Sequence, residues 1–568
     1  MSAEALGVVP DEPDSGGAET ADVVPLHDHP LPRTLEIPES VDIYDTTLRD
    51  GSQQEGLSLT VDDKLRVAEQ LDHLGVAYIE GGWPGANPKD EEFFARAPTE
   101  LRLSTATLVA FGSTRRPGVR ADTDATLRQL LDAGTSAVCI VAKAWDYHVT
   151  EALRTDLDEA VRMAADSVEF LRHAGLRVFL DAEHFFDGYR TNPEFSLRVL
   201  RAAEEAGAEA LVLCDTNGGT LPYEVERVLA EVIPATTADI GVHFHNDGGC
   251  GVANTLAAVR LGATQVQGCV NGYGERTGNA DLCAAVPNLA LKMGVRTIPA
   301  ERLERLTPVA HHIAELVNLA PDPKQPYVGA SAFAHKAGLH TSAIARLPDA
   351  YEHVAPDSVG NGTRFVVSEL SGRSTLALKA AELGLDLGGP ELGDVLQRLK
   401  HLEHRGYHFE VADASLELLM RDAGGWAQPF FVLESFRVSV EQRGDDVLTT
   451  EATVKIHIDG ERIIRTAEGN GPVNALDAAL REAIGARYPA LDDLHLTDYK
   501  VRVLDTDKGT GAVTRVLLDT TDGDRTWSTI GVSANIIEAS WQALCDSIVY
   551  GLLHSGPKEH MGDQGERS

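Results

Sequence analysis

The chain has 568 residues, of which 50 are Lys or Arg and 87 are Asp or Glu, so its formal net charge at pH 7 is -37. A chain of this length exceeds one ordinary hydrophobic core, which predicts roughly two to four domains. The excess of negative charge argues against nucleic acid and anionic membranes as partners, because both would repel it except at a local basic patch, and it favours small-molecule chemistry.

Cysteine usage and hydropathy indicate the compartment. The six cysteines show no C-x-x-C spacing, and several lie in apolar, strand-like runs where a thiol packs as a small hydrophobe. No uninterrupted apolar run is long enough to span a bilayer, and no basic segment followed by an apolar one opens the chain. We therefore expect a cytoplasmic protein in a reducing environment.

The first part of the chain differs in composition from the rest. Residues 1–38 are rich in Pro, Asp, Glu and Gly and cannot bury enough apolar surface to offset their ordering entropy, so we expect a disordered acidic tail. Beyond it, short apolar runs alternate with longer amphipathic segments. The strand-like runs lie at 41–45, 76–82, 103–111, 136–143, 177–186, 209–216, 239–247 and 264–272. Eight such alternations over roughly 250 residues predict an α/β fold, a (β/α)8 TIM barrel over residues 39–300.

Polar residues gather where the predicted strands end. In a (β/α)8 barrel these carboxyl ends meet on one rim, where the chemistry takes place. The ends of six predicted strands read DTTLRDG, EGGWPGANPKD, DAEHFFDG, CDTNGG, HFHNDGG and NGYGERTGN. A barrel built for stability alone has no need of so many charged and imidazole groups on one rim, although Asp, Thr and Gly also favour turns for local reasons.

Two histidines on the seventh predicted strand suggest a metal site. His243 and His245 are separated by one residue, so on a strand both side chains point to the same face. Such a pair alone is more often two ordinary, partly buried histidines. A carboxylate from the first strand, which lies beside the eighth in a closed barrel, would complete a ligand set, and Asp50 is the candidate. Mixed nitrogen and oxygen ligands suit Mg, Mn or Zn.

Three further polar residues each have two interpretations. Arg49 is either a cation aimed at an oxygen that becomes negative during reaction or one half of a rim salt bridge. Glu183 is either a general base or orienting carboxylate, or the ion-pair partner of Arg190 or Lys143. Thr216 either hydrogen-bonds a substrate carboxylate or caps the next helix.

The motifs DTTLRDGSQ, VHFHND, NGYGERTGN and SAFAHKAGLHTSAI together resemble those of the 2-isopropylmalate, homocitrate and citramalate synthases. These are metal-dependent barrels that perform Claisen condensations with acyl-CoA. The resemblance covers Val41 to about Leu552, and EGGWPGANPKD is most similar to the citramalate branch. It implies condensation of acetyl-CoA with pyruvate, or with a bulkier 2-oxo acid as in the isopropylmalate and homocitrate synthases. A cleaving lyase of similar barrel type and an amino-acid sensor on an inactive barrel are the alternatives from other classes.

The resemblance also implies residue roles on the barrel rim. Arg49 matches the arginine that polarises the keto carbonyl, while Gln53 and Thr216 match positions near the 2-oxo acid. The matches to metal-site residues are Asp50, His243, His245 and Asn279.

The proton-transfer residues implied by the resemblance are Glu183, His340 and Tyr351. Glu183 matches the acidic catalytic residue, His340 the catalytic histidine and Tyr351 the tyrosine that assists it. His335 is the nearby competitor for the histidine role, but the family's Gly-x-His pattern falls on His340. Both histidines lie beyond the eight predicted strands, so they must reach the barrel from a following segment or from the other chain of a dimer.

The rest of the chain changes texture twice. Residues 301–425 show helical periodicity and predict small helical subdomains, and residues 426–552 alternate strands and helices before a disordered tail at 553–568. Within 426–552, strand-like runs followed by a glycine turn and a helix occur twice, about sixty residues apart. We expect an α+β regulatory domain, with a generic dimerisation domain as the alternative, and a homodimer.

The resemblance implies that this domain binds the end product of the pathway, isoleucine or leucine. The turns 469–475 and 531–537 are the expected contacts, because glycine permits close backbone approach and a helix N-terminus offers N–H groups to a carboxylate. The expected effector-binding residues are Gly471, Asn474, Gly531 and Asn535. Ile530, Val532 and Ile536 are expected to hold the effector's side chain.

Overall fold

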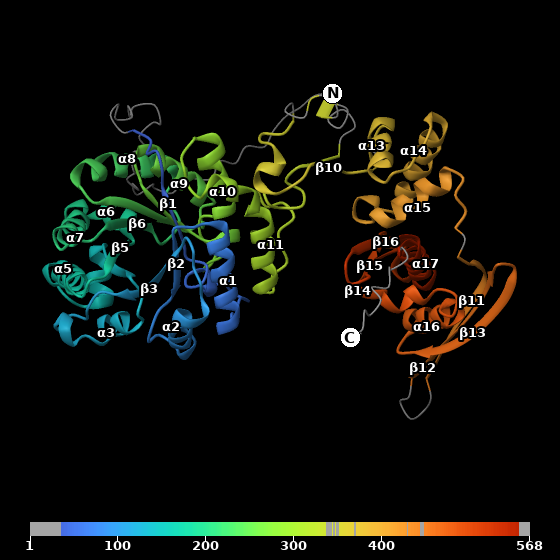
Figure 1. The fold of residues 1–568 in the computed structure, drawn as a ribbon, viewed down its shortest axis with the longest axis horizontal. Coiled ribbons are helices and arrows are strands. Elements are labelled where there is room, and N and C mark those ends of the chain that lie inside the picture. Colours follow the sequence, from blue (N-terminus) through green and yellow to red (C-terminus); the bar gives the residue numbers. More distant parts are fainter. Residues whose placement is uncertain are drawn as a thin grey trace, which may run out of the picture. The chain divides into compact units, whose positions relative to one another are not determined.

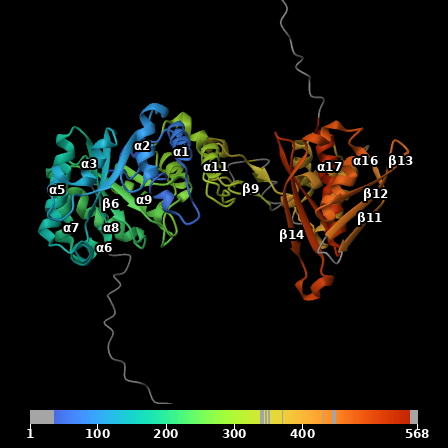
Figure 2. The same cartoon turned by 90° about the horizontal axis from the view of Figure 1, so that it is seen from below.

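The computed structural model describes residues 36–555 except 337–342, 345–346, 348–350, 369–370, 429 and 443–447. The chain divides into two compact units, Met1–Ala332 with Asp357–Asn361, and Phe333–Pro356 with Gly362–Ser568. The elements of both units are drawn in Figures 1 and 2. Among the described residues, no helix has the length and apolar character needed to cross a bilayer.

The first unit contains eight parallel strands that close in the order β1 to β8, which confirms the predicted barrel. The closing pair is β1 with β8, from Asp42 opposite Gln265 to Asp45 opposite Gly268. The strands are β1 Asp42–Asp45, β2 Tyr78–Gly82, β3 Thr107–Ser113, β4 Ala137–Lys143, β5 Arg177–Glu183, β6 Ala210–Asp215, β7 Asp239–Phe244 and β8 Gln265–Gly268.

Helices between the strands surround the barrel (Figure 1). Local sequence signals set their ends: α1 begins with a capping box between Thr60 and Asp63, and it stops at Gly75, whose φ of 96° suits glycine. The helices of this unit are α1 Val61–Leu74, α2 Pro88–Glu100, α3 Ala125–Asp132, α4 Asp146–His148, α5 Leu157–His173, α6 Phe185–Thr191, α7 Pro193–Glu205, α8 Pro222–Val232, α9 Gly251–Leu261, α10 Leu282–Pro287 and α11 Leu306–Leu316.

The barrel interior changes from apolar to charged along the strands. Alternation on β5 puts Phe179, Asp181 and Glu183 on one face, in order toward the carboxyl end. Phe179 packs edge-on against Tyr44 and Tyr78, with ring centroids 6.0 and 5.0 Å away. The polar residues of the rim follow this aromatic layer toward the carboxyl ends of the strands.

The second unit contains short strands, helices and two three-stranded antiparallel sheets, each followed by a long helix (Figure 2). Strands β9 (Ala334–His335) and β10 (Arg364–Phe365) pair in parallel, and α13 (Arg373–Glu382), α14 (Gly389–His404) and α15 (Asp413–Ala423) come after them. The first sheet-and-helix repeat is β11 Val432–Gln442, β12 Leu448–Ile458, β13 Glu461–Gly469 and α16 Pro472–Ile484. The second is β14 His495–Val503, β15 Thr514–Thr521, β16 Thr526–Ser533 and α17 Ile536–His554.

The third strand of each repeat, β13 or β16, was not recognised in the sequence. Ile458 pairs with Glu461 across a two-residue turn, Asp459-Gly460, in which φ is 49° and 82°. Asp-Gly with two positive φ values is the hairpin turn that matches strand twist. That dipeptide was the available signal for β13.

Candidate active site

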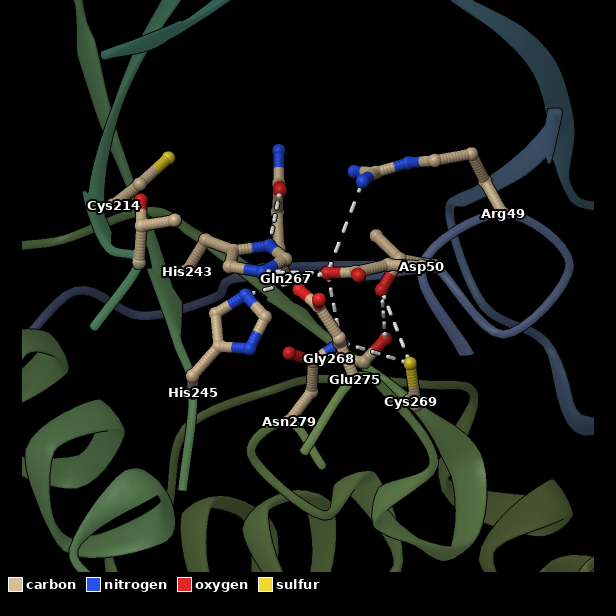
Figure 3. Close-up of polar contacts among 12 residues, drawn as sticks. Arg49, Asp50, Cys214, His243, His245, Gln267, Gly268, Cys269, Glu275 and Asn279 are labelled. Carbon is tan, nitrogen blue, oxygen red and sulfur yellow. Dashed lines mark hydrogen bonds and ion pairs between the residues drawn. The ribbon is translucent and has the colours of Figure 1, made fainter. Parts of the chain in front are cut away.

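Three buried side chains with metal-ligating atoms meet at the carboxyl end of the barrel (Figure 3). Asp50 follows β1 at the start of a short 3-10 turn, His243 lies on β7, and His245 comes directly after that strand. The Asp50 Oδ2 atom is 3.1 Å from Nε2 of His243 and 3.5 Å from Nε2 of His245. The predicted grouping of Asp50 with the two histidines is therefore present in the geometry.

A buried carboxylate shapes the loop that presents Asp50. Asp45, at the end of β1, accepts hydrogen bonds from the Thr47 N–H (2.8 Å), the Thr47 hydroxyl (3.0 Å) and the Val270 N–H (3.2 Å). Burial raises the pKa of Asp45 to about 7, although these hydrogen bonds oppose the rise. The bonds join the loop after β1 to the loop after β8, which brings Asp50 back over the barrel mouth.

Charge and burial set the protonation of Asp50 and His245. Burial alone would raise the pKa of Asp50, but Arg49 and the two imidazoles outweigh it and hold that pKa well below the ordinary value. Burial, with the neighbouring His243 second, lowers the pKa of His245 to about 3. Asp50 is therefore an anion and His245 a neutral imidazole at physiological pH, the states that a cation requires of its ligands.

Asn279 completes the cluster. Its Nδ2 donates to Oδ2 of Asp50 at 3.0 Å, and a backbone bridge joins it to His245. Its Oδ1 is buried and has no hydrogen-bond partner among the described residues, which is also the case for Nδ1 of His245. An unsatisfied carboxamide oxygen beside a carboxylate and two imidazoles fits a divalent cation with mixed oxygen and nitrogen ligands.

Arg49 is held by a second buried carboxylate. Its Nε donates to Oε2 of Glu80 at 2.5 Å, and Tyr44 donates to the other oxygen of Glu80 at 2.8 Å. The guanidinium carbon lies 3.9 Å from the centroid of the Phe111 ring, and Nη1 is 3.8 Å from Oδ2 of Asp50. Because Glu80 is fully buried, this is an interior pair rather than a rim salt bridge.

Glu183 and Thr216, two further candidates on the rim, differ in their contacts. Glu183 forms an ion pair with Lys143, its register partner on β4, while Arg190 pairs with Asp187 instead. The expected Glu183–Lys143 pair is thus present, and the catalytic role of Glu183 stays a prediction. The Thr216 hydroxyl accepts a hydrogen bond from the His184 N–H at 3.0 Å and caps no helix.

Gln53 lies in the 3-10 turn after Asp50 and is exposed. The neighbouring Gln54 lines a cavity of about 410 Å³ together with Asn279. The 3-10 turn Gly51–Gln53 determines which of the two amides faces inward. That turn was not apparent in the sequence, so Gln54 was missed.

Sequence reasoning also missed Glu80, Asp181 and Gln267. They lie inside the barrel with exposed fractions of 0, 3 and 0 %. The available signal was a charged or amide residue within an otherwise apolar strand, at a position whose parity points inward.

The expected proton-transfer residues beyond the barrel remain predictions. His340 lies outside the described residues. Tyr351 belongs to the second unit and is 47 % exposed, and His335 lies on β9 with its Nε2 3.5 Å from Oε1 of Glu352.

The expected effector residues have defined local roles in the second unit. Gly471 is the N-cap of α16, and Oδ1 of Asn474 accepts the Asn470 N–H at 3.0 Å. Asn535 caps α17 by accepting the N–H groups of Ile537 and Glu538, at 2.9 and 3.4 Å. These two N–H groups already have an acceptor, contrary to the expectation that they are free.

Gly531 lies within β16 rather than in a turn. A Cβ atom there would come 1.9 Å from the carbonyl oxygen of Ala539, so the glycine permits close packing of α17 on its own sheet. Ile530 and Val532 are 1 and 2 % exposed inside the core, whereas Ile536 is 44 % exposed. Of the three expected apolar contacts, only Ile536 has substantial exposure.

Asn474 lines a cavity of about 290 Å³ between α16 and α17.

Comparisons with known proteins match three consecutive parts of the chain. The HMGL-like family model matches residues 40–311, the homocitrate synthase post-HMGL domain-like model 327–407, and the LeuA allosteric (dimerisation) domain model 410–552. The chain is 55 % identical to the (R)-citramalate synthase of Streptomyces coelicolor, over 92 % of this chain and 98 % of that one. The (R)-citramalate synthases of Synechocystis sp. and Aquifex aeolicus are 51 and 50 % identical, over 90 and 91 % of this chain and 96 and 98 % of theirs.

Proposed function

The chain belongs to the (R)-citramalate synthase family, and we propose that its barrel condenses acetyl-CoA with pyruvate and then hydrolyses the thioester. The observation that carries this proposal is the buried cluster of Asp50, His243 and His245 with the guanidinium of Arg49 beside it. The cluster supplies ligand atoms and positive charge where the oxygens of a 2-oxo acid would lie. The product acid would enter isoleucine biosynthesis.

Asp50, His243 and His245, with Oδ1 of Asn279, would hold a divalent cation, for which Mg, Mn and Zn are the candidates. When bound, the cation supplies Lewis-acid polarisation of the keto group and a fixed orientation for the 2-oxo acid. The pKa of His245, lowered to about 3 mainly by burial, keeps that imidazole neutral and ready to bind.

Arg49 stabilises the oxygen that becomes negative when the new carbon–carbon bond forms. Its Nε is occupied by Glu80, so its terminal nitrogens remain to donate, and Nη1 lies 3.8 Å from Asp50 among the ligand side chains. Preplaced positive charge of this kind lowers the barrier because it need not reorganise during the reaction. Thr216 accepts from the His184 N–H, so its own hydroxyl proton is available for the substrate carboxylate, near which Gln53 is also proposed.

A base drawn from Glu183, His340 and Tyr351 removes a proton from the methyl group of acetyl-CoA. The electron pair enters the enolate of the thioester and then attacks the keto carbon of pyruvate. The resulting alkoxide takes a proton, and water cleaves the thioester to release CoA and the diacid. Glu183 is paired with Lys143, and this contact fixes its direction as a group that orients a proton carrier.

A panel of 2-oxo acids with acetyl-CoA and a thiol-release assay tests the substrate. Pyruvate should be turned over best, and the product should be (R)-citramalate by chiral chromatography. A clear preference for 2-oxoisovalerate would indicate an isopropylmalate synthase, and cleavage without condensation would indicate a lyase. Cation binding without turnover of any 2-oxo acid would leave a sensor on an inactive barrel.

The second unit is proposed to regulate the enzyme and to join two chains. Residues 410–552 match a domain described as allosteric and dimerisation. On the edge strand β14, side chains on the same face as the buried Val516 and Leu518 of β15 remain 36–48 % exposed. They are Leu496, Tyr499, Val501 and Val503. An apolar stripe on an edge strand is suited to pairing with another chain, which supports a homodimer.

Isoleucine, with leucine second, is the proposed effector of residues 426–552. The proposed contacts are Gly471, Asn474, Gly531 and Asn535, of which Asn474 lines the cavity of about 290 Å³ beside α16 and α17. Light scattering tests the dimer, and rate measurements with added amino acids test the effector. All six cysteines are free thiols, which supports work in the reducing cytoplasm.

A further inference from the structure

The imidazole of His243 forms a hydrogen bond with the side-chain amide of Gln267. Its Nε2 faces Asp50, and its Nδ1 is 2.9 Å from Oε1 of Gln267 on the neighbouring strand β8, where the two residues are register partners (Figure 3). The amide nitrogen of Gln267 donates in turn to Oδ1 of Asp181 on β5, at 3.1 Å. All three side chains are at most 4 % exposed. A buried polar chain therefore runs from the ligand cluster to a carboxylate inside the barrel.

The direction of each hydrogen bond follows from which atoms can donate. The amide NH₂ of Gln267 donates to Asp181, so its carbonyl oxygen turns toward His243. A carbonyl oxygen only accepts, so Nδ1 of His243 must carry the proton. Nε2, the atom that faces Asp50, is then the ring nitrogen that can offer a lone pair to a cation. The opposite amide orientation would favour the proton on Nε2 and would remove His243 as a ligand.

We propose that Gln267 and Asp181 are positioning residues that fix His243 in the tautomer able to bind a cation. The other histidine is different: Nδ1 of His245 is buried without a hydrogen-bond partner among the described residues, so nothing there selects its tautomer. His243 is thus the preset ligand of the pair, and His245 adjusts to the bound cation. Residues that hydrogen-bond to a metal ligand commonly change metal affinity 10- to 100-fold. We expect an effect of roughly that size here.

An amide suits the middle position for an electrostatic reason. The site already contains Asp50, while Glu80, Cys139 and Asp181 have ligand atoms within 4.8 Å of one another deeper in the barrel. A carboxylate at position 267 in addition to that of Asp181 would add a further negative charge to this interior. Gln267 transmits the orientation from Asp181 without adding that charge.

The inference rests on the proposed metal site but does not depend on turnover. The test is therefore a double-substitution cycle in which Mn²⁺ affinity is measured. Gln267→Leu removes the acceptor and should weaken Mn²⁺ binding by roughly tenfold or more. Asp181→Asn offers Gln267 a donor as well as an acceptor, so the amide is no longer held in one orientation and Mn²⁺ binding should weaken in the same direction. The double variant Gln267→Glu/Asp181→Asn exchanges carboxylate and amide. It again offers an acceptor to Nδ1 of His243 and a donor to residue 267, so it should recover affinity to within about threefold of the wild type.

Gln265→Leu is the matched control. Gln265 is the neighbouring inward-facing glutamine on β8, and it meets the buried polar chain through a long 3.5 Å bond from Gln267, so Mn²⁺ affinity should change less than about threefold. A purely packing role for Gln267 would give no recovery in the double variant. That result, or wild-type affinity in Gln267→Leu, would overturn the inference.

The two possible failures can be separated. If the wild type binds no Mn²⁺, or if its Mn²⁺ binding persists in Asp50→Asn, the proposed metal site itself is wrong. If wild-type binding is lost in Asp50→Asn but unchanged in Gln267→Leu and Asp181→Asn, only the positioning role is wrong. Should Gln267→Leu fail to fold by circular dichroism, the comparison of Asp181→Asn with the double variant still decides the outcome.

Discussion

Arg49 and Glu80 form an ion pair within the barrel, with Nε of the guanidinium 2.5 Å from a carboxylate oxygen that is fully buried. The pair fixes the direction of the guanidinium that we assign to the substrate oxygen. Because it lies inside the fold, the pair affects both stability and catalysis.

Glu80→Gln should therefore be costly in two measurements. Removing one partner of a buried ion pair leaves an uncompensated charge and should lower the free energy of unfolding by on the order of 3 kcal/mol in urea titrations. The misdirected guanidinium should lower kcat/KM for pyruvate by about tenfold or more. Glu100→Gln breaks the exposed pair with Arg96 on α2 and should change neither quantity appreciably. Equal behaviour of the two variants would contradict the role of Glu80.

Chelation tests the cation. Exhaustive treatment with a chelator should abolish CoA release, and added Mg²⁺ or Mn²⁺ should restore it, because a site of this mixed type binds reversibly. Asp50→Asn should prevent the restoration. Glu55→Gln, an exposed change in the same loop, should leave it intact. Activity that survives exhaustive chelation would overturn the site.

His340→Ala tests the proposed base. Loss of a positioned general base should lower kcat by roughly 10²- to 10⁴-fold, while pyruvate binding by the barrel, measured by calorimetry, should persist. Tyr351→Phe should have a smaller effect in the same direction. His335→Ala, five residues away, is the matched control and should keep most activity. If His335→Ala is the inactive variant, the two histidine roles must be exchanged.

Asp546 on α17 gives a pH prediction. Burial raises its pKa to about 7 against a single hydrogen bond from Ser415, so it is protonated in the folded state at pH 5 and ionised in the unfolded chain. The unfolded state then binds fewer protons, and this group's contribution to stability falls as pH rises from about 5 to 8. Asp546→Asn should gain on the order of 2 kcal/mol relative to wild type over that interval in urea titrations.

The control for this prediction is Asp522→Asn. Burial would raise the pKa of Asp522, but hydrogen bonds from Arg525 outweigh it and lower that pKa, so the group is ionised in both states above pH 5. Its loss should change stability equally at pH 5 and pH 8. A wild-type pH profile in Asp546→Asn would show that the carboxyl is hydrated rather than buried.

Removal of residues after 425 tests regulation. The truncated barrel and helical segment should keep some condensation activity and lose its response to isoleucine, because an effector must bind two states unequally to shift their balance. In the full chain, Asn474→Ala should raise the isoleucine concentration needed for half inhibition. Loss of all activity on truncation would favour the dimerisation interpretation instead. No response of rate or thermal stability to isoleucine, leucine or valine would reject the effector.

The barrel was predictable because its signals are local and repeated. Eight apolar runs separated by amphipathic segments leave few architectures, and the two-residue spacing of His243 and His245 places both on one face. Asp50 could be added because strand one must neighbour strand eight in a closed barrel. These inferences need only periodicity and closure.

The features that could not be predicted depend on turns and on packing between distant strands. The 3-10 turn after Asp50 determines that Gln54 rather than Gln53 faces the cavity. Gln267 and Asp181 are brought together across the barrel by hydrogen bonds between residues far apart in sequence. Gly531 was expected in an effector turn, but the approach of α17 to β16 accounts for it, and such packing cannot be inferred from one segment alone.

The bonds from Thr47 and Val270 to Asp45 have a consequence for how the enzyme matures. Val270 lies 225 residues after Asp45, so the bond that joins the first loop to the last one can form only after β8 has been synthesised. Cation affinity then appears only when the polypeptide has closed on itself. Barrel fragments that stop short of β8 should accumulate as metal-free species, and the cation should select completed molecules from incomplete ones.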